Sequence, residues 1–566
     1  MNKPWLVNYP KGVPAEIDLG EFASILEIFD RSCERFATRN AFCNFKTHMT
    51  YAELNRQTRN FAAYLQQQGL KKGDRIALMM PNILQYPVAL FGALRAGLVV
   101  VNTNPMYTAR ELKHQLLDSG ARAIVIVENF AHVLQEIRSD VPLDCVLTTR
   151  VGDMLEFPKG LLVNFVLKYL KKAIPAWSLP GSCSFTKAVQ QGQGLTFQPV
   201  QLGFEDIAFL QYTGGTTGVA KGAMLTHRNL VANMLQSRAW LTSNDIGEGG
   251  EIIITALPLY HIFALTANCL VFMSLGGCNV LVTNPRDMEG FVKELRENRF
   301  TMITGVNTLF NSLLHTPGFS DLDFTELKGA LGGGMAVQRA VAERWKEVTG
   351  RPLIEAYGLT ETSPGACMNP LDLEEFTGSI GMPIPSTECA IMNDEGELLD
   401  TGETGELVVR GPQVMKGYWQ RPEETAKVLT EDGWLRTGDI AVMDERGYFR
   451  IVDRKKDMIL VSGFNVFPNE IEDVLAMHPK VQEVAAIGLP DEKSGESVKV
   501  FIVPKDKSLT VDEIQQFAAG QLTGYKRPRH VEFCEELPKS NVGKILRREL
   551  RATALRALGE SGKPQH

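Results

Sequence analysis

The spacing of apolar residues in the first third of the chain predicts helices that alternate with short strands. Apolar residues recur with the helical period over residues 24–36, 51–68, 85–96 and 109–119. Short, almost wholly apolar runs at residues 75–80 and 123–127 are typical of buried strands. Strands and helices in alternation predict an α/β layer with a parallel sheet. A second layer of the same kind is indicated further on by apolar runs at residues 252–256, 279–282 and 302–304.

The pattern changes after about residue 378, where short strands and glycine turns replace the alternation. Residues 389–410 and 432–454 have the strand–turn–strand pattern of a small β subdomain. A last module combines helices over residues 470–477, 511–522 and 544–555 with strands over residues 483–487, 498–503 and 531–533. We therefore predict an α/β fold, with a large N-terminal domain of two sheet subdomains plus a small β subdomain, and a small α+β C-terminal domain. The charged run Asp453-Arg-Lys-Lys-Asp457 places the domains at 1–453 and 454–566.

Composition and charge narrow the class of protein. The chain of 566 residues has a formal net charge of −7. No global basic field therefore points to nucleic acid, and polyanionic ligands must be bound by local groups. The nine cysteines are scattered without a CxxC pair, which is typical of reduced thiols in the cytoplasm. The N-terminus has no apolar run of signal-peptide length, and no window holds the ~18 apolar residues of a spanning helix.

One basic amphipathic segment, residues 155–177, leaves two interpretations open. Its apolar residues are interleaved with Lys159, Lys168, Lys171 and Lys172. Such a segment can lie on a membrane surface, or it can be a surface helix that packs on its own domain. We expect a cytoplasmic protein and leave a peripheral contact with the inner face of the membrane open.

The strongest local signal is the run Tyr212-Thr-Gly-Gly-Thr-Thr-Gly-Val-Ala-Lys-Gly222. Glycines let the backbone turn tightly and bring N–H groups against an anion, while threonine hydroxyls and a lysine ammonium add donors. The spacing is not that of the P-loop, because Lys221 follows Ala220 rather than glycine and no Ser or Thr comes next. The residues predicted to bind phosphate are Thr213, Gly214, Gly215, Thr216, Thr217, Gly218 and Lys221.

Five motifs in register resemble those of the adenylate-forming superfamily, which includes acyl-CoA synthetases, nonribosomal-peptide adenylation domains and beetle luciferases. The phosphate loop is the first motif. The others follow in the order Tyr357-Gly-Leu-Thr-Glu-Thr362, Thr437-Gly-Asp439, Asp453-Arg454 with the loop Ser462-Gly-Phe-Asn-Val-Phe467, and Pro538-Lys-Ser-Asn-Val-Gly-Lys544. The resemblance covers nearly the whole chain. It implies that residues 1–453 bind AMP and the acyl group, and that residues 454–566 form a mobile domain beyond a hinge at Lys456.

The resemblance also implies how the nucleotide is held. Tyr357 is expected to stack on adenine, and Asp439 and Arg454 to bind the ribose hydroxyls. The Gly332-Gly-Gly334 triplet would let the backbone approach the other face of the base. Outside the phosphate loop, the cofactor-binding residues implied are Gly333, Gly334, Tyr357, Gly358, Thr360, Asp439, Arg454, Lys456 and Gly463.

The catalytic residues implied are Lys544, Glu361, Thr217 and His261. Lys544 would stabilise the negative charge that gathers when a carboxylate attacks the α-phosphate of ATP. A carboxylate is already a nucleophile, so no general base is required. Glu361 and Thr217 are expected to hold Mg²⁺ beside the phosphates. His261 would line the acyl site, although a lone histidine in an apolar run can also be a packed core residue.

The identity of the acid substrate is indicated by features that are less specific than these motifs. The run from Asp432 to Lys455 looks like the fatty acyl-CoA synthetase signature, and residues 8–13 and 155–177 resemble bacterial long-chain enzymes. Asn541 and Arg436 depart from the residues that are common there. Apolar segments 262–275 and 305–314 are candidates for the wall of an acyl tunnel or for core.

The predicted function is therefore a fatty acid–CoA ligase with fatty acid, ATP and CoA as ligands, and long-chain acids are favoured. Fatty acyl-adenylate ligases tend to carry an insertion near the hinge, and the absence of one between Arg454 and Gly463 favours CoA as the acceptor. A medium-chain ligase, an acyl-AMP ligase that loads a carrier protein, and a nucleotide-binding regulatory module remain as alternatives. No nucleic-acid partner is expected, and a homodimer is left open.

Overall fold

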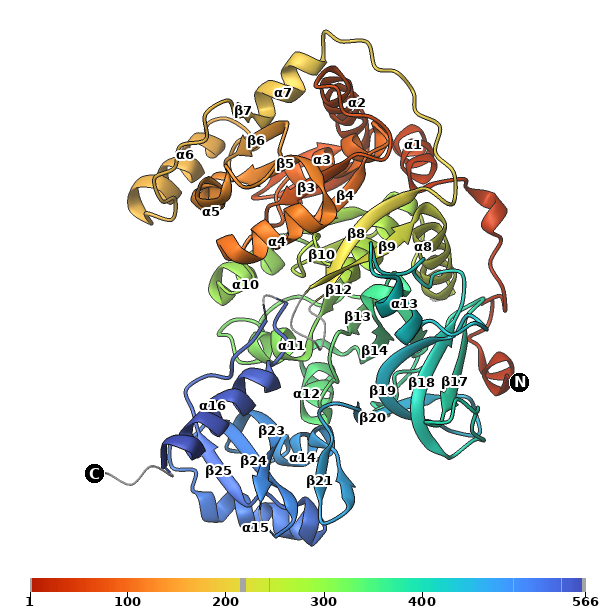
Figure 1. Cartoon of the computed structure of the whole chain (residues 1–566), viewed down its shortest axis with the longest axis vertical. Coiled ribbons are helices and arrows are strands. Elements are labelled where there is room, and N and C mark those ends of the chain that lie inside the picture. Colours follow the sequence, from red (N-terminus) through yellow and green to blue (C-terminus); the bar gives the residue numbers. More distant parts are fainter. Residues whose placement is uncertain (1–2, 214–219, 244, 492, 541, 562–566) are drawn as a thin grey trace.

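The first sheet of the N-terminal part is built mainly from parallel strands (Figure 1). The computed structural model describes residues 3–213, 220–243, 245–491, 493–540 and 542–561. Only the β8–β9 pair of this sheet is antiparallel within those ranges. In spatial order the strands are β7 (Cys183–Ser184), β6 (Cys145–Thr149), β5 (Ala121–Val127), β3 (Arg75–Met79), β4 (Val99–Asn102), β8 (Ile207–Thr213) and β9 (Lys221–Thr226).

The second sheet joins strands that lie far apart in the sequence. Its parallel centre runs from β14 to β1, and its outer strands at both ends pair in antiparallel fashion. In spatial order the strands are β16 (Met382–Pro383), β15 (Gly365–Met368), β14 (Leu353–Gly358), β13 (Gly329–Gly332), β12 (Met302–Gly305), β10 (Ile252–Thr255), β11 (Cys278–Leu281), β1 (Asn40–Asn44) and β2 (Thr47–Thr50). The two layers expected from the apolar runs are therefore present.

Helices cover the faces of both sheets, and several begin at a capping box. Thr50 and Glu53 cap α2, and Thr108 and Glu111 cap α4, so the first N–H groups of these helices are satisfied. Every residue of α3 is buried, which explains why its sequence is apolar around its whole circumference. The helices are α1 (Ile25–Arg35), α2 (Tyr51–Gln67), α3 (Gln85–Arg95), α4 (Ala109–Ser119), α5 (Ala131–Ile137), α6 (Lys159–Phe165), α7 (Phe185–Gly192), α8 (His227–Leu241), α9 (Val271–Ser274), α10 (Met288–Glu297), α11 (Asn307–Leu314) and α12 (Arg339–Thr349).

A small antiparallel sheet forms the β subdomain, in the order β17 (Glu388–Met392), β18 (Thr404–Arg410), β19 (Leu435–Met443) and β20 (Phe449–Arg454). The N-terminal arm lies against this sheet. Trp5 is buried beside Phe449, with their ring centroids 6.3 Å apart. A Cβ on Gly447 would come within 2.5 Å of the backbone nitrogen of Trp5, so the arm depends on glycine in that turn.

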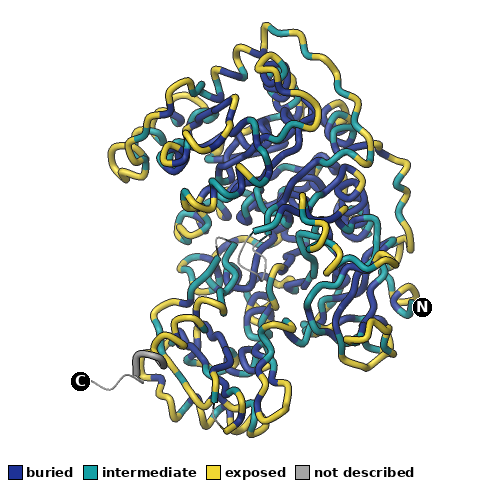
Figure 2. The backbone as a smooth tube through the Cα atoms, viewed as in Figure 1, coloured by how far each residue is buried: buried dark blue, intermediate teal, exposed yellow. Residues whose placement is uncertain are grey.

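The C-terminal domain has its own mixed sheet and its own hydrophobic cores. Its elements are β21 (Ile459–Val461), β22 (Phe464–Val466), α14 (Pro468–Ala476), β23 (Val481–Asp491), β24 (Gly495–Pro504), α15 (Val511–Gln521), β25 (His530–Phe533) and α16 (Arg547–Ser561). Figure 2 shows that buried backbone gathers on the strands here as in the larger domain. None of the helices in the described ranges is long and apolar enough to cross a bilayer. The fold class predicted from the sequence is confirmed, while the boundary between residues 453 and 454 stays a prediction.

One predicted element was placed wrongly. The basic helix expected over residues 544–555 begins at Arg547, and Lys544 precedes it. The reason is a tight turn in which the hydroxyl of Ser540 accepts the N–H of Lys544 at 3.1 Å. The backbone N–H of Ser540 also donates to the carbonyl of Lys544 at 2.7 Å.

Arg547 fastens the start of α16 to the strand that enters the C-terminal domain. Its guanidinium donates to both carboxylate oxygens of Glu472, at 2.9 and 2.6 Å. It also lies 3.5 Å from Asp453 at the end of β20 and 3.6 Å from Asp457. Burial raises the pKa of Asp453 to about 6 even though Arg547 favours its charged form. The guanidinium therefore supports a cluster of carboxylates that water does not reach freely.

We predict that Arg547→Met lowers the free energy of unfolding of the C-terminal domain by about 3–5 kcal/mol, because Glu472 and Asp453 would lose their partner while they stay buried. Hydrogen exchange of the amides in β23 and β24 measures this change. The six tryptophans all precede residue 454, so their fluorescence reports only on the larger domain.

The adjacent Arg548 is exposed and provides the matched control. Arg548→Met should change the same exchange rates by the equivalent of no more than about 0.5 kcal/mol. Equal effects of the two substitutions would contradict the anchoring role of Arg547.

Candidate active site

A cavity of about 1480 Å³ opens where the second sheet, the β subdomain and the C-terminal domain meet. It collects residues from motifs that are hundreds of positions apart. Gly463 does not line it, and Gly214, Gly215, Thr216, Thr217 and Gly218 lie outside the described residues. The predicted site residues that line it are Thr213, Lys221, His261, Gly333, Gly334, Tyr357, Gly358, Thr360, Glu361, Asp439, Arg454, Lys456 and Lys544.

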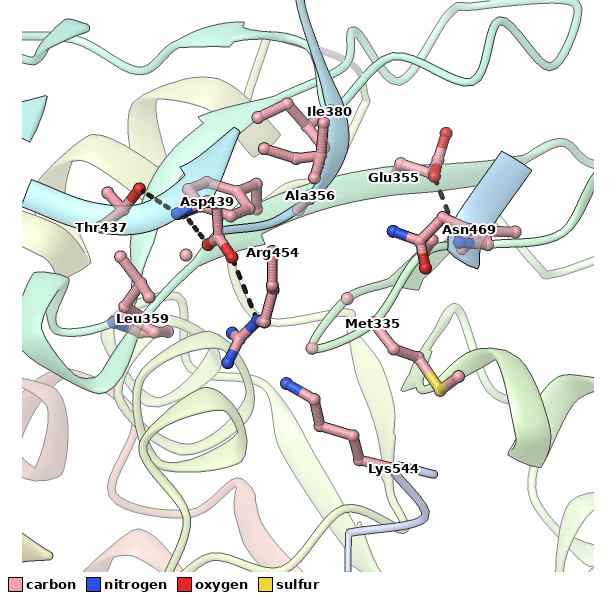
Figure 3. A pocket seen from close by; sticks show the side chains of 18 of the residues that line it. Met335, Glu355, Ala356, Leu359, Ile380, Thr437, Asp439, Arg454, Asn469 and Lys544 are labelled. Carbon is pink, nitrogen blue, oxygen red and sulfur yellow. Dashed lines mark hydrogen bonds and ion pairs between the residues drawn. The ribbon is translucent and has the colours of Figure 1, made fainter. Parts of the chain in front are cut away.

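Asp439 is the hub of the polar wall (Figure 3). Its carboxylate accepts the hydroxyl of Tyr357 at 2.6 Å and lies 3.1 Å from the guanidinium of Arg454. These residues come from β19, β14 and β20, and the antiparallel register of β19 and β20 places Asp439 directly opposite Arg454. Burial, and next the charge of Asp439, raise the pKa of Tyr357, so its hydroxyl remains a donor. The hydrogen bond thus fixes the ring of Tyr357 next to the carboxylate of Asp439.

Lys544 reaches this wall from the C-terminal domain, and Figure 3 shows its side chain pointing toward Arg454. The turn that carries it rests on α11, where the hydroxyl of Thr308 donates to the carbonyl of Gly543 at 2.8 Å. Gly543 has φ +81°, and a Cβ there would come within 2.9 Å of the same hydroxyl oxygen. A glycine is therefore required both by the turn and by its close approach to the larger domain.

The ammonium of Lys544 is held in an environment that disfavours its charge. Burial is the main cause, and the nearby guanidinium of Arg454 adds to it, so the pKa of Lys544 falls to about 7. Asp439 acts in the opposite direction. A site with this excess of positive charge is suited to a polyanion, which would restore the full charge of the lysine.

His261 also lines the cavity, within electrostatic reach of Lys544. Burial and then the charge of Lys544 lower its pKa to about 4, so it is neutral near pH 7. Its Nδ1 atom lies 3.3 Å from the N–H of Phe263 and can accept it. A neutral imidazole beside an ammonium can hold a polar head group without adding charge.

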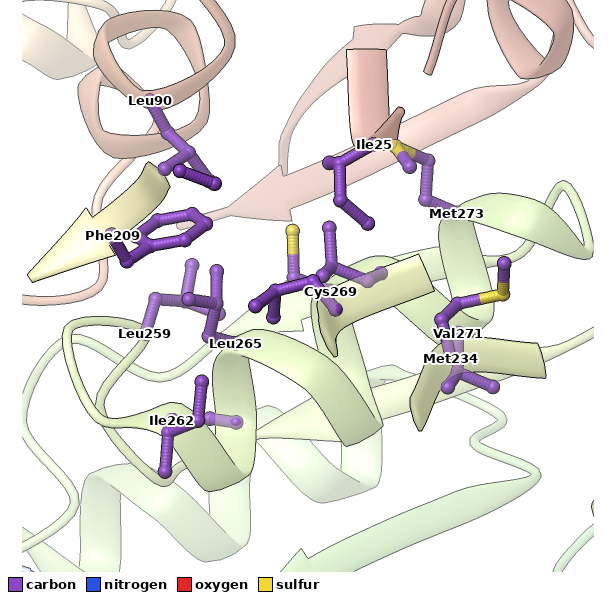
Figure 4. Close-up of a cluster of buried hydrophobic side chains, with 14 of the residues drawn as sticks. Ile25, Leu90, Phe209, Met234, Leu259, Ile262, Leu265, Cys269, Val271 and Met273 are labelled. Atoms are coloured by element: carbon purple, nitrogen blue, oxygen red, sulfur yellow. The ribbon is translucent and has the colours of Figure 1, made fainter. Parts of the chain in front are cut away.

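The segment after His261 serves both as core and as cavity wall. Figure 4 shows Ile262, Leu265, Cys269, Val271 and Met273 within one buried apolar cluster. The helical turns here include η5, a π-helix over Ala264–Leu270, whose wider turn is frequent at functional sites. The apolar residues that line the cavity include Leu257, Ile262, Phe263, Ala267, Val306 and Leu331. Residues 262–275 therefore belong to the core and also line part of the cavity, while their role as the wall of an acyl tunnel stays a prediction.

Close packing explains two of the predicted glycines. A Cβ on Gly333 would lie 3.0 Å from the ring of Phe263 and 3.1 Å from the carbonyl oxygen of Ala356, so a side chain would intrude on the cavity wall. A Cβ on Gly358 would lie 1.9 Å from the carbonyl oxygen of Pro364. Gly358 is therefore needed by the turn that carries Glu361, whatever it contributes to a ligand.

A cluster of charged and aromatic side chains around Lys221 and Glu361 was not predicted from the sequence. Glu361 accepts the hydroxyl of Tyr418 at 2.7 Å, and the ammonium of Lys221 lies 5.2 Å from the centre of the Tyr418 ring. Lys221 also forms an ion pair with Glu424 on α13 (Pro422–Val428). The ammonium groups of Lys221 and then Lys427 lower the pKa of Glu424 to about 2. Two glutamates in the charged run after Tyr418 were the only signal of these contacts in the sequence.

Glu361 is also the residue that fits a metal ion. No group of three or more histidine, cysteine or acidic side chains suited to a metal occurs in the described part of the chain. Mg²⁺ is commonly held by one or two carboxylates together with substrate phosphates, so a single carboxylate on the cavity wall is compatible with it. Thr217, its other predicted ligand, lies outside the described residues.

The predicted hinge is a short connection. β20 ends at Arg454 and β21 begins at Ile459, and the N–H of Lys455 donates to the carbonyl of Gly438 at 3.0 Å. Gly463 lies in the β21–β22 turn with φ +84°, away from the cavity that contains Lys544. The structure thus brings Lys544 to the site and leaves Gly463 outside it.

Known proteins match nearly the whole length of the chain. The family profile of the AMP-binding enzyme matches residues 29–419, and that of the AMP-binding enzyme C-terminal domain matches residues 470–544. The long-chain-fatty-acid–CoA ligase of Escherichia coli O157:H7 is 58% identical over 98% of this chain and 99% of its own length. The enzyme of the same name from Haemophilus influenzae is 53% identical over 97% and 98%.

A solved structure agrees in fold. The anthranilate CoA ligase AuaEII in complex with anthranoyl-AMP superimposes with a TM-score of 0.85 at 25% identity, and the match covers 96% of this chain and 100% of that one. The motifs, the cavity and these matches have one explanation. The chain belongs to the family of AMP-binding enzymes, within the adenylate-forming superfamily.

Proposed function

We propose that this protein is a fatty acid–CoA ligase and that it prefers long-chain acids. In the first half-reaction the carboxylate displaces pyrophosphate from ATP and forms acyl-AMP. In the second, the thiol of CoA displaces AMP, and the thioester acyl-CoA forms with release of the thiol proton. Both steps occur at one acyl carbon, so one cavity has to serve both.

The observation that carries the proposal is the composition of that cavity. Tyr357, Asp439 and Arg454 offer a platform and polar partners for a nucleoside, while Lys544 faces them. The adjoining wall near His261 is apolar, which suits a fatty acyl chain. A nucleotide site and an apolar site that share one ammonium group are what acid adenylation requires.

The role we assign to Lys544 follows from charge. When the carboxylate attacks the α-phosphorus, negative charge gathers on the phosphoryl oxygens, and an ammonium at that point stabilises the transition state more than the ground state. Entry of ATP also raises the pKa of Lys544 from about 7, because its phosphates offset Arg454. We propose that bound ATP itself keeps the amino group of Lys544 protonated.

The other assigned roles concern binding. Glu361, together with Thr217, would hold Mg²⁺, which when bound neutralises phosphate charge. Lys221 is proposed to leave Glu424 for a phosphate oxygen. His261, neutral near pH 7, would orient the carboxylate of the acid. With these roles, the phosphate loop and the apolar wall near His261 would hold the α-phosphate of ATP and the carboxylate of the acid next to each other.

The second half-reaction is proposed to use a different domain arrangement. Rotation at Lys456 would withdraw Lys544 and bring the turn with Gly463 to the cavity. A hinge needs only a few residues that absorb the change in φ and ψ, and residues 455–458 between β20 and β21 meet that need. Thr308 would release Gly543 in the process.

The chain-length preference rests on the relatives. Their names specify long-chain fatty acids at 53–58% identity over nearly the full length. The reduced cysteines implied by the sequence fit the cytoplasm, which we propose as the location.

A panel of acids tests the proposal directly. We expect ATP–pyrophosphate exchange to be maximal with acids of about twelve carbons or more, because each buried methylene adds about 0.8 kcal/mol of binding. Addition of CoA should then yield acyl-CoA. Maximal exchange with acetate or an aromatic acid would contradict the fatty acid assignment, and acyl-AMP without thioester would indicate a carrier-loading ligase.

Lys544→Ala should reduce acyl-AMP formation by about 10²–10³-fold, the usual effect of losing one charge-stabilising group. Formation of acyl-CoA from supplied acyl-AMP should be largely retained, since Lys544 is withdrawn in that step. Both rates can be measured in single-turnover assays. The exposed Lys507 supplies the control Lys507→Ala, which should leave both rates unchanged. Equal loss of both half-reactions would rule out the assigned role.

Lys456→Pro should slow the CoA step at least about tenfold more than the adenylation step, because proline fixes φ and restricts the proposed rotation. Lys456→Ala removes the same side chain but leaves the backbone free, so it should affect the two steps equally. If the two variants behave alike, the backbone at Lys456 is not the hinge.

A further inference from the structure

An apolar face on α6 stands apart from the cavity and has no partner in the described structure. Helix α6 continues into η4, a π-helix over Val166–Leu170, and together they form a projection at the edge of the larger domain (Figure 1). Large apolar side chains along it are between 52% and 84% exposed. We call this set the α6 face; it consists of Phe157, Leu161, Leu162, Phe165, Tyr169 and Leu170.

The concentration is unusual for one protein surface. The described residues expose sixteen large hydrophobic side chains, and six of them fall within these fourteen positions. Single exposed apolar residues need no explanation, but a contiguous patch marks an interaction site. Figure 2 shows the segment among the exposed parts of the backbone.

The inner side of α6 packs closely against the larger domain, and these contacts orient the α6 face toward solvent. Gly160 is buried, and a Cβ there would lie 2.3 Å from the carbonyl oxygen of Gly152. Asn164 accepts the N–H of Gly152 at 2.8 Å and donates to Asp153 at 3.1 Å. Val163 and Leu167 pack against the core. The segment therefore packs on its own domain with one side only, and the two interpretations of residues 155–177 do not exclude each other.

The charged residues near the α6 face indicate which kind of partner would bind it. Residues 157–172 contain four lysines and no acidic residue, although the whole chain has a net charge of −7. Lys168, Lys171 and Lys172 are exposed beside the apolar side chains. All the cations here are lysines, and no arginine occurs between Arg150 and Arg228. Protein interfaces are depleted in lysine and enriched in arginine, whereas lysines flanking an apolar helix face are typical of contact with anionic lipid.

We propose that the α6 face docks this protein on an anionic lipid surface. Leu161, Leu162 and Phe165 would enter the boundary between headgroups and acyl chains, and the lysines would approach the headgroup phosphates. None of the residues of the α6 face lines the cavity, so docking leaves the reaction site free. The proposal goes beyond the proposed ligase activity and does not depend on it.

The first test measures vesicle binding of the full chain by co-sedimentation. Vesicles that contain phosphatidylglycerol should bind the protein more tightly than vesicles of phosphatidylcholine alone. Leu162→Glu with Phe165→Glu should weaken binding at least about tenfold, because two inserted apolar side chains are lost. Leu398→Glu places the same charge at an exposed leucine of the β subdomain and should leave binding unchanged.

The second test removes charge alone. Lys168→Gln, Lys171→Gln and Lys172→Gln together should weaken binding to the anionic vesicles by about a hundredfold, since each lysine near such a surface is worth about 1 kcal/mol. Binding to neutral vesicles should not change. Lys187→Gln, an exposed lysine on α7, is the matched control.

Several outcomes would overturn the proposal. Wild-type binding by the Leu162→Glu, Phe165→Glu variant would show that the face does not touch lipid. Equal loss with the control variants would show that binding is nonspecific. If light scattering without vesicles finds a dimer that only the apolar variant disrupts, and wild type does not bind vesicles, the partner is a second copy of this chain. Formation of acyl-CoA from a soluble acid should stay within twofold in every variant.

Discussion

The buried carboxylate of Asp439 is the interaction on which the geometry of the cavity depends. It draws together β14, β19 and β20 through Tyr357 and Arg454, and its charge also raises the pKa of Lys544. Without it, Arg454 and Lys544 would lose the nearest opposite charge and would repel each other more strongly, which is costly in a poorly solvated site. The same carboxylate fixes the aromatic ring of Tyr357. One charge therefore positions the ring of Tyr357 and the end of β20, which are the groups that we propose as the nucleoside platform and the start of the hinge.

Much of the fold follows from the sequence because its parallel strands are buried on both faces and read as uninterrupted apolar runs. The strand predicted over residues 75–80 is β3, and the helix predicted over residues 109–119 is α4. The start of α16 could not be predicted in this way. Helical periodicity continues through Lys544, but the turn at Ser540 and the contact between Thr308 and Gly543 decide where the helix begins. Such contacts join distant parts of the chain, so the spacing of apolar residues in the sequence does not reveal them.

The site residues also divide into those that local sequence predicts and those that depend on contacts between distant parts of the chain. Glycine, threonine and lysine in a dense run reveal phosphate chemistry by their composition, and Tyr357, Asp439 and Lys544 stand in recognisable motifs. By contrast, Glu424 meets Lys221 across 203 positions of the sequence, and no motif links the two residues. Gly358 shows the opposite case, since this motif residue is required by a turn, whatever it contributes to a ligand. The exposed side of α6 was equally hidden, because amphipathic spacing alone does not tell which side meets solvent.

The burial of Lys544 has a thermochemical consequence. An exposed lysine has a pKa near 10.4, whereas in the docked turn the pKa of Lys544 is about 7. Docking of the C-terminal domain on an empty cavity near neutral pH therefore releases part of a proton to the solvent, and entry of a polyphosphate takes it back. Domain closure and ligand entry thus exchange protons in opposite directions. The apparent heat of nucleotide binding must then vary with the ionisation enthalpy of the buffer, and the slope of that variation gives the net proton uptake to which Lys544 contributes.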